Sequence, residues 1–81
     1  MSLTSIFLSR SEALQLAVTA LQKFEDTKLA GVYGVDTLQG YVDEVTRVLD
    51  STNIEAYMYP YSLLMKIRRE ALELLQITDV D

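Results

Sequence analysis

The sequence predicts an all-α fold: a small antiparallel helical bundle with three long helices and one short helix before Pro60. Three observations favour this class. Apolar side chains recur at helical spacing in three long segments. Helix-start signals precede these segments. Glycine or proline separates them from one another. No repeat, linker or low-complexity tract divides the chain, so we expect residues 1–81 to form a single helical domain.

Residues 4–8 precede the first helix and are too short to form an element of their own. We expect Ile6 and Phe7 to cover one end of the bundle, as terminal segments often do when they are tied down. The alternative is an arm that docks on a second subunit.

The first long helix is expected to run from about Arg10 to Leu29. Ser9 and Glu12 have the spacing of a capping box, in which each side chain accepts a hydrogen bond from a backbone N–H of the other residue. Gly31 is well placed to end the helix in the left-handed conformation. The apolar side chains cover roughly 220° of the circumference. The centre of this apolar face is expected to consist of Leu14, Val18 and Leu21.

The segment Gly31–Val35 is predicted to connect two helices. A phosphate-binding loop would need further glycines, a lysine and a preceding strand, and this segment has none of them. We therefore expect its larger side chains to close the end of the bundle. These side chains are Val32, Tyr33 and Val35.

The second helix is predicted to begin at Asp36, with Gln39 at the matching capping-box position. Its apolar residues follow the clearest amphipathic pattern in the chain. They are Leu38, Tyr41, Val42, Val45, Val48 and Leu49. Gly40 lies on the polar side, where glycine costs about 0.5–1 kcal/mol relative to alanine. Either the glycine is neutral, or another group approaches the backbone at this position.

Thr52 and Glu55 again have capping-box spacing, and we expect one helical turn from Ile54 to Met58. The residue before Pro60 is expected to leave the helical region, and Pro60 to open the final helix in its first turn. Residues 78–81 are predicted to be a frayed acidic tail.

The final helix, from Tyr61 to Ile77, is apolar over roughly 240° of its circumference. A helix with so wide an apolar surface must be covered by more than one neighbour. Because the first helix is almost as apolar, the chain has more apolar surface than a small bundle hides easily. We expect a second copy of the chain, or a helix of another protein, to cover the remainder.

Candidate partner-binding residues lie around the start of the final helix. Three tyrosines at alternating positions supply rigid contact area with a polar tip, which is typical of interfaces. They could instead fill the corner between two helices. Arg68 falls inside the apolar arc, where it either extends to the edge of the core or pairs across an interface with Asp43, Glu44, Asp50 or Glu55. The predicted site consists of Tyr57, Tyr59, Tyr61, Met65, Arg68 and Leu72.

Composition excludes several classes of function. The formal net charge is −5, which disfavours nucleic-acid binding and anionic membranes. The sequence has no histidine and no cysteine, so the commonest general base, the thiol nucleophile and the usual transition-metal ligands are missing. No apolar run reaches the roughly 20 residues of a membrane span. We expect no catalytic residues, cofactor, metal or small-molecule substrate, and a soluble cytoplasmic protein.

These observations predict a non-enzymatic protein–protein interaction or regulatory module that acts as a homodimer through its surplus apolar helix faces. The alternative is a monomeric immunity-type, inhibitor or chaperone-like protein that binds one protein target. In size and number of helices the chain is similar to secretion chaperones and bacteriocin immunity proteins, but no motif supports that likeness. A helix-turn-helix DNA-binding protein would need a basic recognition helix, and an enzyme would need a pocket of carboxylates and tyrosines.

Overall fold

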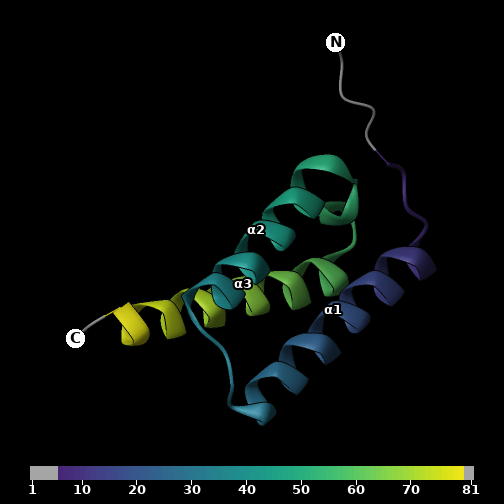
Figure 1. Cartoon of the computed structure of the whole chain (residues 1–81). Helices are drawn as coiled ribbons and strands as arrows, with labels where there is room; N and C mark the ends of the chain where they lie inside the picture. Colours follow the sequence, from purple (N-terminus) through teal and green to yellow (C-terminus); the bar gives the residue numbers. More distant parts are fainter. Residues whose placement is uncertain (1–5, 80–81) are drawn as a thin grey trace.

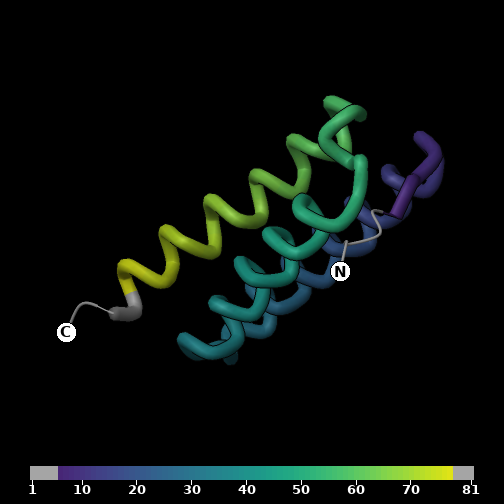
Figure 2. Tube along the Cα trace, turned by 90° about the horizontal axis from the view of Figure 1, so that it is seen from above, coloured from purple at the N-terminus to yellow at the C-terminus, as the bar shows by residue number. Residues whose placement is uncertain are grey.

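The structure, a computed structural model, describes the backbone of residues 6–79 and the side chains of residues 6–77. It consists of α1 (Arg10–Ala30), α2 (Val35–Ser51), a short 3₁₀ helix η1 (Ile54–Ala56) and α3 (Met58–Asp79) (Figure 1). The predicted all-α bundle is therefore confirmed. Successive long helices run in opposite directions, so α1 and α3 are parallel to each other (Figures 1 and 2).

Helix α3 forms the centre of the arrangement because it packs closely on both other long helices. Figure 2 shows α2 and α3 side by side along most of their length. In contrast, α1 and α2 do not pack closely against each other, although only a short segment connects them. The molecule measures 41 × 29 × 16 Å, so in its thinnest direction it is less than two helix diameters deep.

The ends of α1 agree with the sequence signals. The Ser9 hydroxyl accepts a hydrogen bond from the Glu12 N–H at 3.1 Å, and the Glu12 carboxylate accepts one from the Ser9 N–H at 2.8 Å. Gly31 follows the helix with φ 70°, a left-handed conformation that favours glycine. Local chemistry therefore determines where this helix begins and ends.

The start of α2 differs from the prediction. The helix begins at Val35, its N-cap is Gly34, and no side chain caps it, so the predicted Asp36 capping box is wrong. Gln39 instead donates a hydrogen bond to Asp43 at 3.0 Å. The extended backbone of Gly34 allows the helix to begin before Asp36, and the Asp36 carboxylate then lies in the first turn, where the helix dipole favours an acid.

The connection between α2 and α3 also corrects the sequence analysis. Thr52 caps the end of α2: its hydroxyl donates to the Val48 carbonyl at 2.8 Å and accepts from the Ile54 N–H at 3.2 Å. The predicted capping box with Glu55 is therefore absent, and the short helix ends at Ala56 rather than Met58.

Tyr59 lies inside α3, contrary to the prediction that the residue before Pro60 leaves the helix. Pro60 occupies the third position of the helix, where the backbone N–H would have no intrahelical partner, so the proline costs no hydrogen bond there. At the other end, the backbone of Thr78 and Asp79 is helical rather than frayed, whereas Val80 and Asp81 lie outside the described residues.

The core contains apolar side chains from all three long helices, η1 and the N-terminal segment. It consists of Leu8, Ala13, Ala17, Phe24, Leu38, Val42, Val45, Val48, Ile54, Leu64, Ile67 and Ala71. The predicted centre of α1 is wrong, because Leu14 and Val18 are 38% and 45% exposed. The small side chains of Ala13 and Ala17 face the core instead and allow a close approach of α3.

The two ends of the bundle are closed only in part by the expected residues. Phe7 and Val32 are 83% and 85% exposed and do not cover the core. Tyr33 packs against the core as expected, and at the other end Leu8 is buried in place of Phe7. Leu8 is held in place because its N–H donates to the Asn53 side chain at 2.6 Å and its carbonyl accepts from the Tyr57 hydroxyl at 2.9 Å.

Candidate protein-interaction surface

Four of the six predicted partner-binding residues form one stripe along α3. Tyr61, Met65, Arg68 and Leu72 follow one another at i, i+4, i+7 and i+11, the spacing of one helix face. All four are partly or largely accessible, and Leu72 is 42% exposed. The structure therefore brings these side chains together on a single surface.

The other two predicted residues lie elsewhere. The Tyr57 hydroxyl donates to the Leu8 carbonyl, and its ring packs against the core, so Tyr57 fills the corner before α3. Tyr59 is exposed but precedes Tyr61 by two helical positions, which turns it about 200° away from the stripe. The tyrosine cluster in the sequence is therefore divided between a structural role and two different surfaces.

The stripe on α3 continues onto α2, on the side of the bundle that faces away from α1. The opposite flanks of both helices contact α1: Tyr41 of α2 packs against Phe24, and Glu70 of α3 pairs with Lys28. Helical spacing places the accessible residues Val35, Thr46 and Leu49 of α2 on the side nearer α3. We call the surface made by these three residues and the α3 stripe the α2/α3 face.

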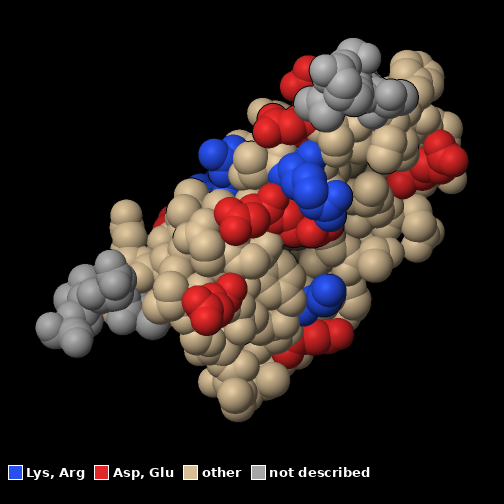
Figure 3. All heavy atoms as spheres, turned by 45° about the horizontal axis from the view of Figure 1, so that its top comes forward, with Lys and Arg blue, Asp and Glu red and all other residues tan. Residues whose placement is uncertain are grey.

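The two halves of the α2/α3 face carry opposite charges. The α3 half contains Arg68 and, at its edge, Arg69, whereas Asp43 and Asp50 lie along the edge of the α2 half. Among the described residues Arg68 makes no ion pair, so none of the four carboxylates considered in the sequence analysis pairs with it within the chain. In the view of Figure 3, acidic and basic side chains are interspersed with wide uncharged areas.

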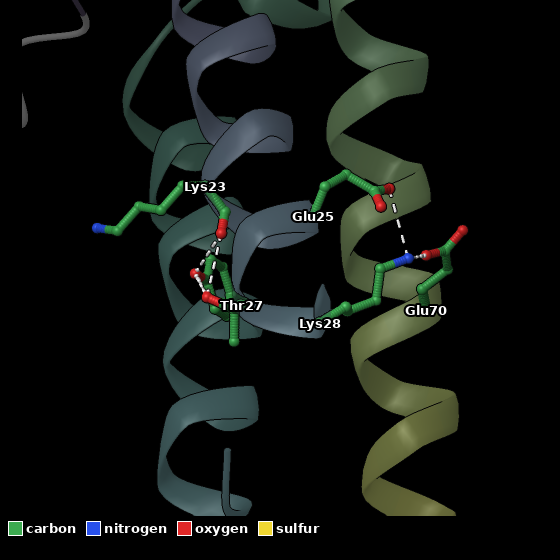
Figure 4. A network of polar contacts seen from close by, with 6 residues as sticks. Lys23, Glu25, Thr27, Lys28 and Glu70 are labelled. Carbon is green, nitrogen blue, oxygen red and sulfur yellow. Dashed lines mark hydrogen bonds and ion pairs between the residues drawn. The ribbon is translucent and has the colours of Figure 1, made fainter. Parts of the chain in front are cut away.

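A polar network joins the C-terminal end of α1 to both other long helices (Figure 4). The hydroxyls of Thr27 and Tyr41 are 2.6 Å apart and hydrogen-bond to each other, and both lie near the Lys23 carbonyl oxygen, at 3.0 and 3.2 Å. On the other side, Lys28 Nζ lies 2.7 Å from a Glu70 carboxylate oxygen and 3.4 Å from one of Glu25. This network fixes the position of α1 relative to α2 and α3.

The electrostatics of this network raise the pKa of Lys28 above its ordinary value. The main cause is the hydrogen bond to Glu70, with a smaller effect of the same sign from Glu25 and an opposing effect from partial burial. The Lys28 ammonium also lies 5.0 Å from the centre of the Phe24 ring, where its charge is attracted by the π-system. The pair between Lys28 and Glu70 ties α1 to α3.

A second surface feature lies between α1 and α2, where an elongated groove of about 760 Å³ separates the two helices. Leu64 and Ile67 of α3 form its floor. Its α1 wall contains Gln15, Leu16, Thr19, Ala20 and Lys23, and its α2 wall contains Thr37, Gly40, Tyr41, Glu44, Val45, Arg47 and Val48. The groove was not predicted from the sequence. Gly40, on the polar side of an amphipathic helix, was the one local signal.

Among residues 6–77, no three acidic side chains lie close enough together to hold a metal ion. None of the helices in the described part of the chain has the length and apolar character needed to cross a membrane. Comparisons with protein-family models, with curated proteins and with solved structures found no match.

Proposed function

We propose that the protein is a non-enzymatic protein-interaction or regulatory module that acts as a homodimer, with the α2/α3 face as the contact between two copies. The observation that supports this proposal most directly is the charge distribution of the face. Arg68 lies among Tyr61, Met65 and Leu72 on one half, and carboxylates border the other half. A surface that carries both signs can be complementary to itself.

The charge distribution also favours one symmetry for the dimer. A two-fold axis parallel to the helices places α3 of each copy over α2 of the other, so that Arg68 and Arg69 face the carboxylates of α2. An axis perpendicular to the helices would place α3 over α3 and bring the arginines of the two copies together. We therefore propose the first arrangement, in which each α3 packs antiparallel to the α2 of the second copy.

Asp43 is the carboxylate best placed to meet Arg68 in this arrangement. Tyr41 contacts Phe24 of α1, and Lys28, about one turn further along α1, contacts Glu70 of α3. Asp43 and Arg68 consequently lie within about one helical turn of each other along the bundle. A two-fold axis parallel to the helices preserves this offset, which the long Arg68 side chain can span across the interface.

Sedimentation equilibrium of the wild type and of Leu72→Asp tests the proposal. The wild type should form a dimer, and the new carboxylate on the α2/α3 face should produce a monomer with an unchanged far-ultraviolet circular dichroism spectrum. Leu14→Asp is the matched control, since Leu14 is 38% and Leu72 42% exposed. This control should remain dimeric. A monomeric wild type, or equal dimerisation of wild type and Leu72→Asp, would overturn the proposal.

A monomer that binds one protein target is the alternative function. The groove between α1 and α2 favours this alternative. It lies apart from the α2/α3 face, so a target could enter it without any dimer contact. A protein that uses the groove could bind its target either as a monomer or as a dimer.

A further inference from the structure

Residues 6–8, which we call the strap, run beside the connection between α2 and α3. Ile6 forms an isolated parallel β-bridge with Thr52, and its N–H donates to the Ser51 carbonyl at 2.7 Å. Leu8 is buried in the core, whereas Phe7 between them is 83% exposed. This alternation is that of a β-strand with one face on the protein. The strap is therefore bound as an extended segment.

The connection itself, residues 51–57, which we call the corner, holds the strap backbone with two side chains. The Asn53 amide makes two hydrogen bonds to Leu8: its oxygen accepts from the Leu8 N–H at 2.6 Å, and its nitrogen donates to the Leu8 carbonyl at 3.1 Å. The Tyr57 hydroxyl donates to the same carbonyl at 2.9 Å. Within the part of the chain that the structure describes, these two polar side chains hydrogen-bond to the strap alone.

These contacts define which segments the corner can accept. The hydrogen bonds go to the main chain, which every segment carries, so they select an extended conformation rather than a sequence. Leu8 provides the one buried side chain of the strap, so this position requires a large aliphatic residue. The position of Phe7 faces away from the protein and places no demand on the side chain.

The strap can leave the corner while both of its neighbours stay folded. On one side, the capping box of Ser9 and Glu12 fixes the start of α1 without any atom of the strap. On the other side, the Thr52 hydroxyl joins the Val48 carbonyl to the Ile54 N–H, and Ile54 is fully buried. Because the strap has a single buried side chain, we expect it to open more readily than the helices.

We propose that the corner binds an extended segment of another protein with a large aliphatic residue at the position of Leu8, and that the strap is an autoinhibitory occupant that this segment displaces. Exchange of straps between two copies is disfavoured, because every contact made in trans would be lost in cis. A segment of another protein can continue past the point where the strap turns into α1 and make contacts that the strap cannot. The corner shares no residue with the α2/α3 face, so this binding is independent of the proposed homodimer.

Two synthetic peptides test the proposal by fluorescence anisotropy. One has the sequence of residues 4–10, and the control has aspartate in place of its leucine. Leu8→Ala weakens the strap and leaves the corner intact, so this variant should bind the leucine peptide about tenfold more tightly than the wild type does. Phe7→Ala is the matched control, since Phe7 is exposed, and should bind like the wild type. Equal affinity of Leu8→Ala and the wild type, or equal binding of the two peptides, would overturn the proposal.

The hydrogen bonds of the corner are tested in the Leu8→Ala background, where the strap competes less. Adding Asn53→Ala removes both amide hydrogen bonds and should weaken peptide binding about tenfold relative to Leu8→Ala alone. Addition of the leucine peptide to Leu8→Ala should shift the backbone amide NMR signals of residues 51–57. Unchanged affinity of the double variant, or shifts concentrated in residues 61–72, would contradict the assignment to the corner.

Native-state hydrogen exchange of the wild type tests the opening of the strap without any variant. The Leu8 amide should exchange through a local opening whose free energy does not change with low concentrations of urea. The amide of the buried residue Ile67 in α3 should exchange through global unfolding, with a free energy that falls as urea is added. Equal free energies and equal urea dependences at the two amides would show that the strap and the bundle open together, and would overturn the proposal.

Discussion

Helix α1 meets α3 along one seam and α2 along another, and these two lines of contact differ. Toward α3 the seam is closed: Ala13 and Ala17 are fully buried, and Lys28 pairs with Glu70 at 2.7 Å. Toward α2 the helices touch where Phe24 meets Tyr41 and then separate along the groove. The helix closest to α1 in sequence is therefore not the one that packs against it best.

Side-chain size accounts for this difference better than chain connection does. Alanines let two helix backbones come close, so their neighbours interlock along the whole seam. A phenylalanine and a tyrosine in contact hold their helices further apart. The closed seam contributes stability, whereas the open seam leaves a surface available to another molecule.

The largest loss of stability is expected at Phe24, whose ring joins α1 to α2 at one end of the open seam. Phe24→Ala removes a fully buried ring together with its edge-to-face contact with Tyr41 and its contact with the Lys28 ammonium. The free energy of unfolding should fall by about 3–5 kcal/mol. Urea denaturation measures this change. Phe7→Ala is the control, since Phe7 is exposed, and should change stability by less than about 0.5 kcal/mol. Equal effects of the two variants would refute the packing described here.

A pair of identical substitutions compares the two seams directly. Ala17→Leu inserts three carbons into the closed seam, where the alanine side chain is fully buried, and should destabilise the protein by about 1–3 kcal/mol. Ala20→Leu places the same side chain at the wall of the open groove, where it has space, and should cost much less. Thermal unfolding of both variants shows which of them loses more stability. A larger loss for Ala20→Leu would mean that the groove is closed in solution.

A smaller effect is expected for the ion pair of the closed seam. Glu70→Gln removes the main cause of the raised Lys28 pKa and should reduce stability by up to about 1 kcal/mol at neutral pH. Because the folded-state pKa is raised, this contribution is fully present below the ordinary value of 10.5 and is lost as the pH rises through the folded-state pKa.

Denaturation of the wild type and of Glu70→Gln at neutral pH and above pH 10.5 tests this linkage. The stability difference between the two proteins should shrink at the higher pH. The exposed residue Glu73 provides the control, and Glu73→Gln should show neither the loss nor its pH dependence. A difference that grows with pH would contradict the assignment.

The sequence predicted the features that depend on neighbouring residues. Ser9, Glu12 and Gly31 act within one turn of the chain, so their roles at the ends of α1 could be recognised. The centre of the α1 core could not be located, because its apolar arc covers roughly 220° and the helix that packs on it selects the buried part. Ala13 and Ala17 were selected over Leu14 and Val18, because α3 approaches the small side chains.

The candidate sites show the same limit. Helical spacing was sufficient to group Tyr61, Met65, Arg68 and Leu72, because they belong to one helix. It could not assign Tyr57 to the corner, since that role depends on a hydrogen bond to Leu8, 49 positions earlier. The groove depends on the angle between α1 and α2, which no local pattern specifies.

The proposed dimer can be tested by exchanging two charges and measuring sedimentation equilibrium at low salt. Arg68→Asp and Asp43→Arg should each weaken the dimer about tenfold or more, because each places like charges opposite one another at the interface. The double variant should regain most of the lost affinity, since the charges are again opposite. Recovery in the double variant would support α3 of one copy lying over α2 of the other. Single variants that dimerise like the wild type, or a double variant no better than either single one, would contradict it.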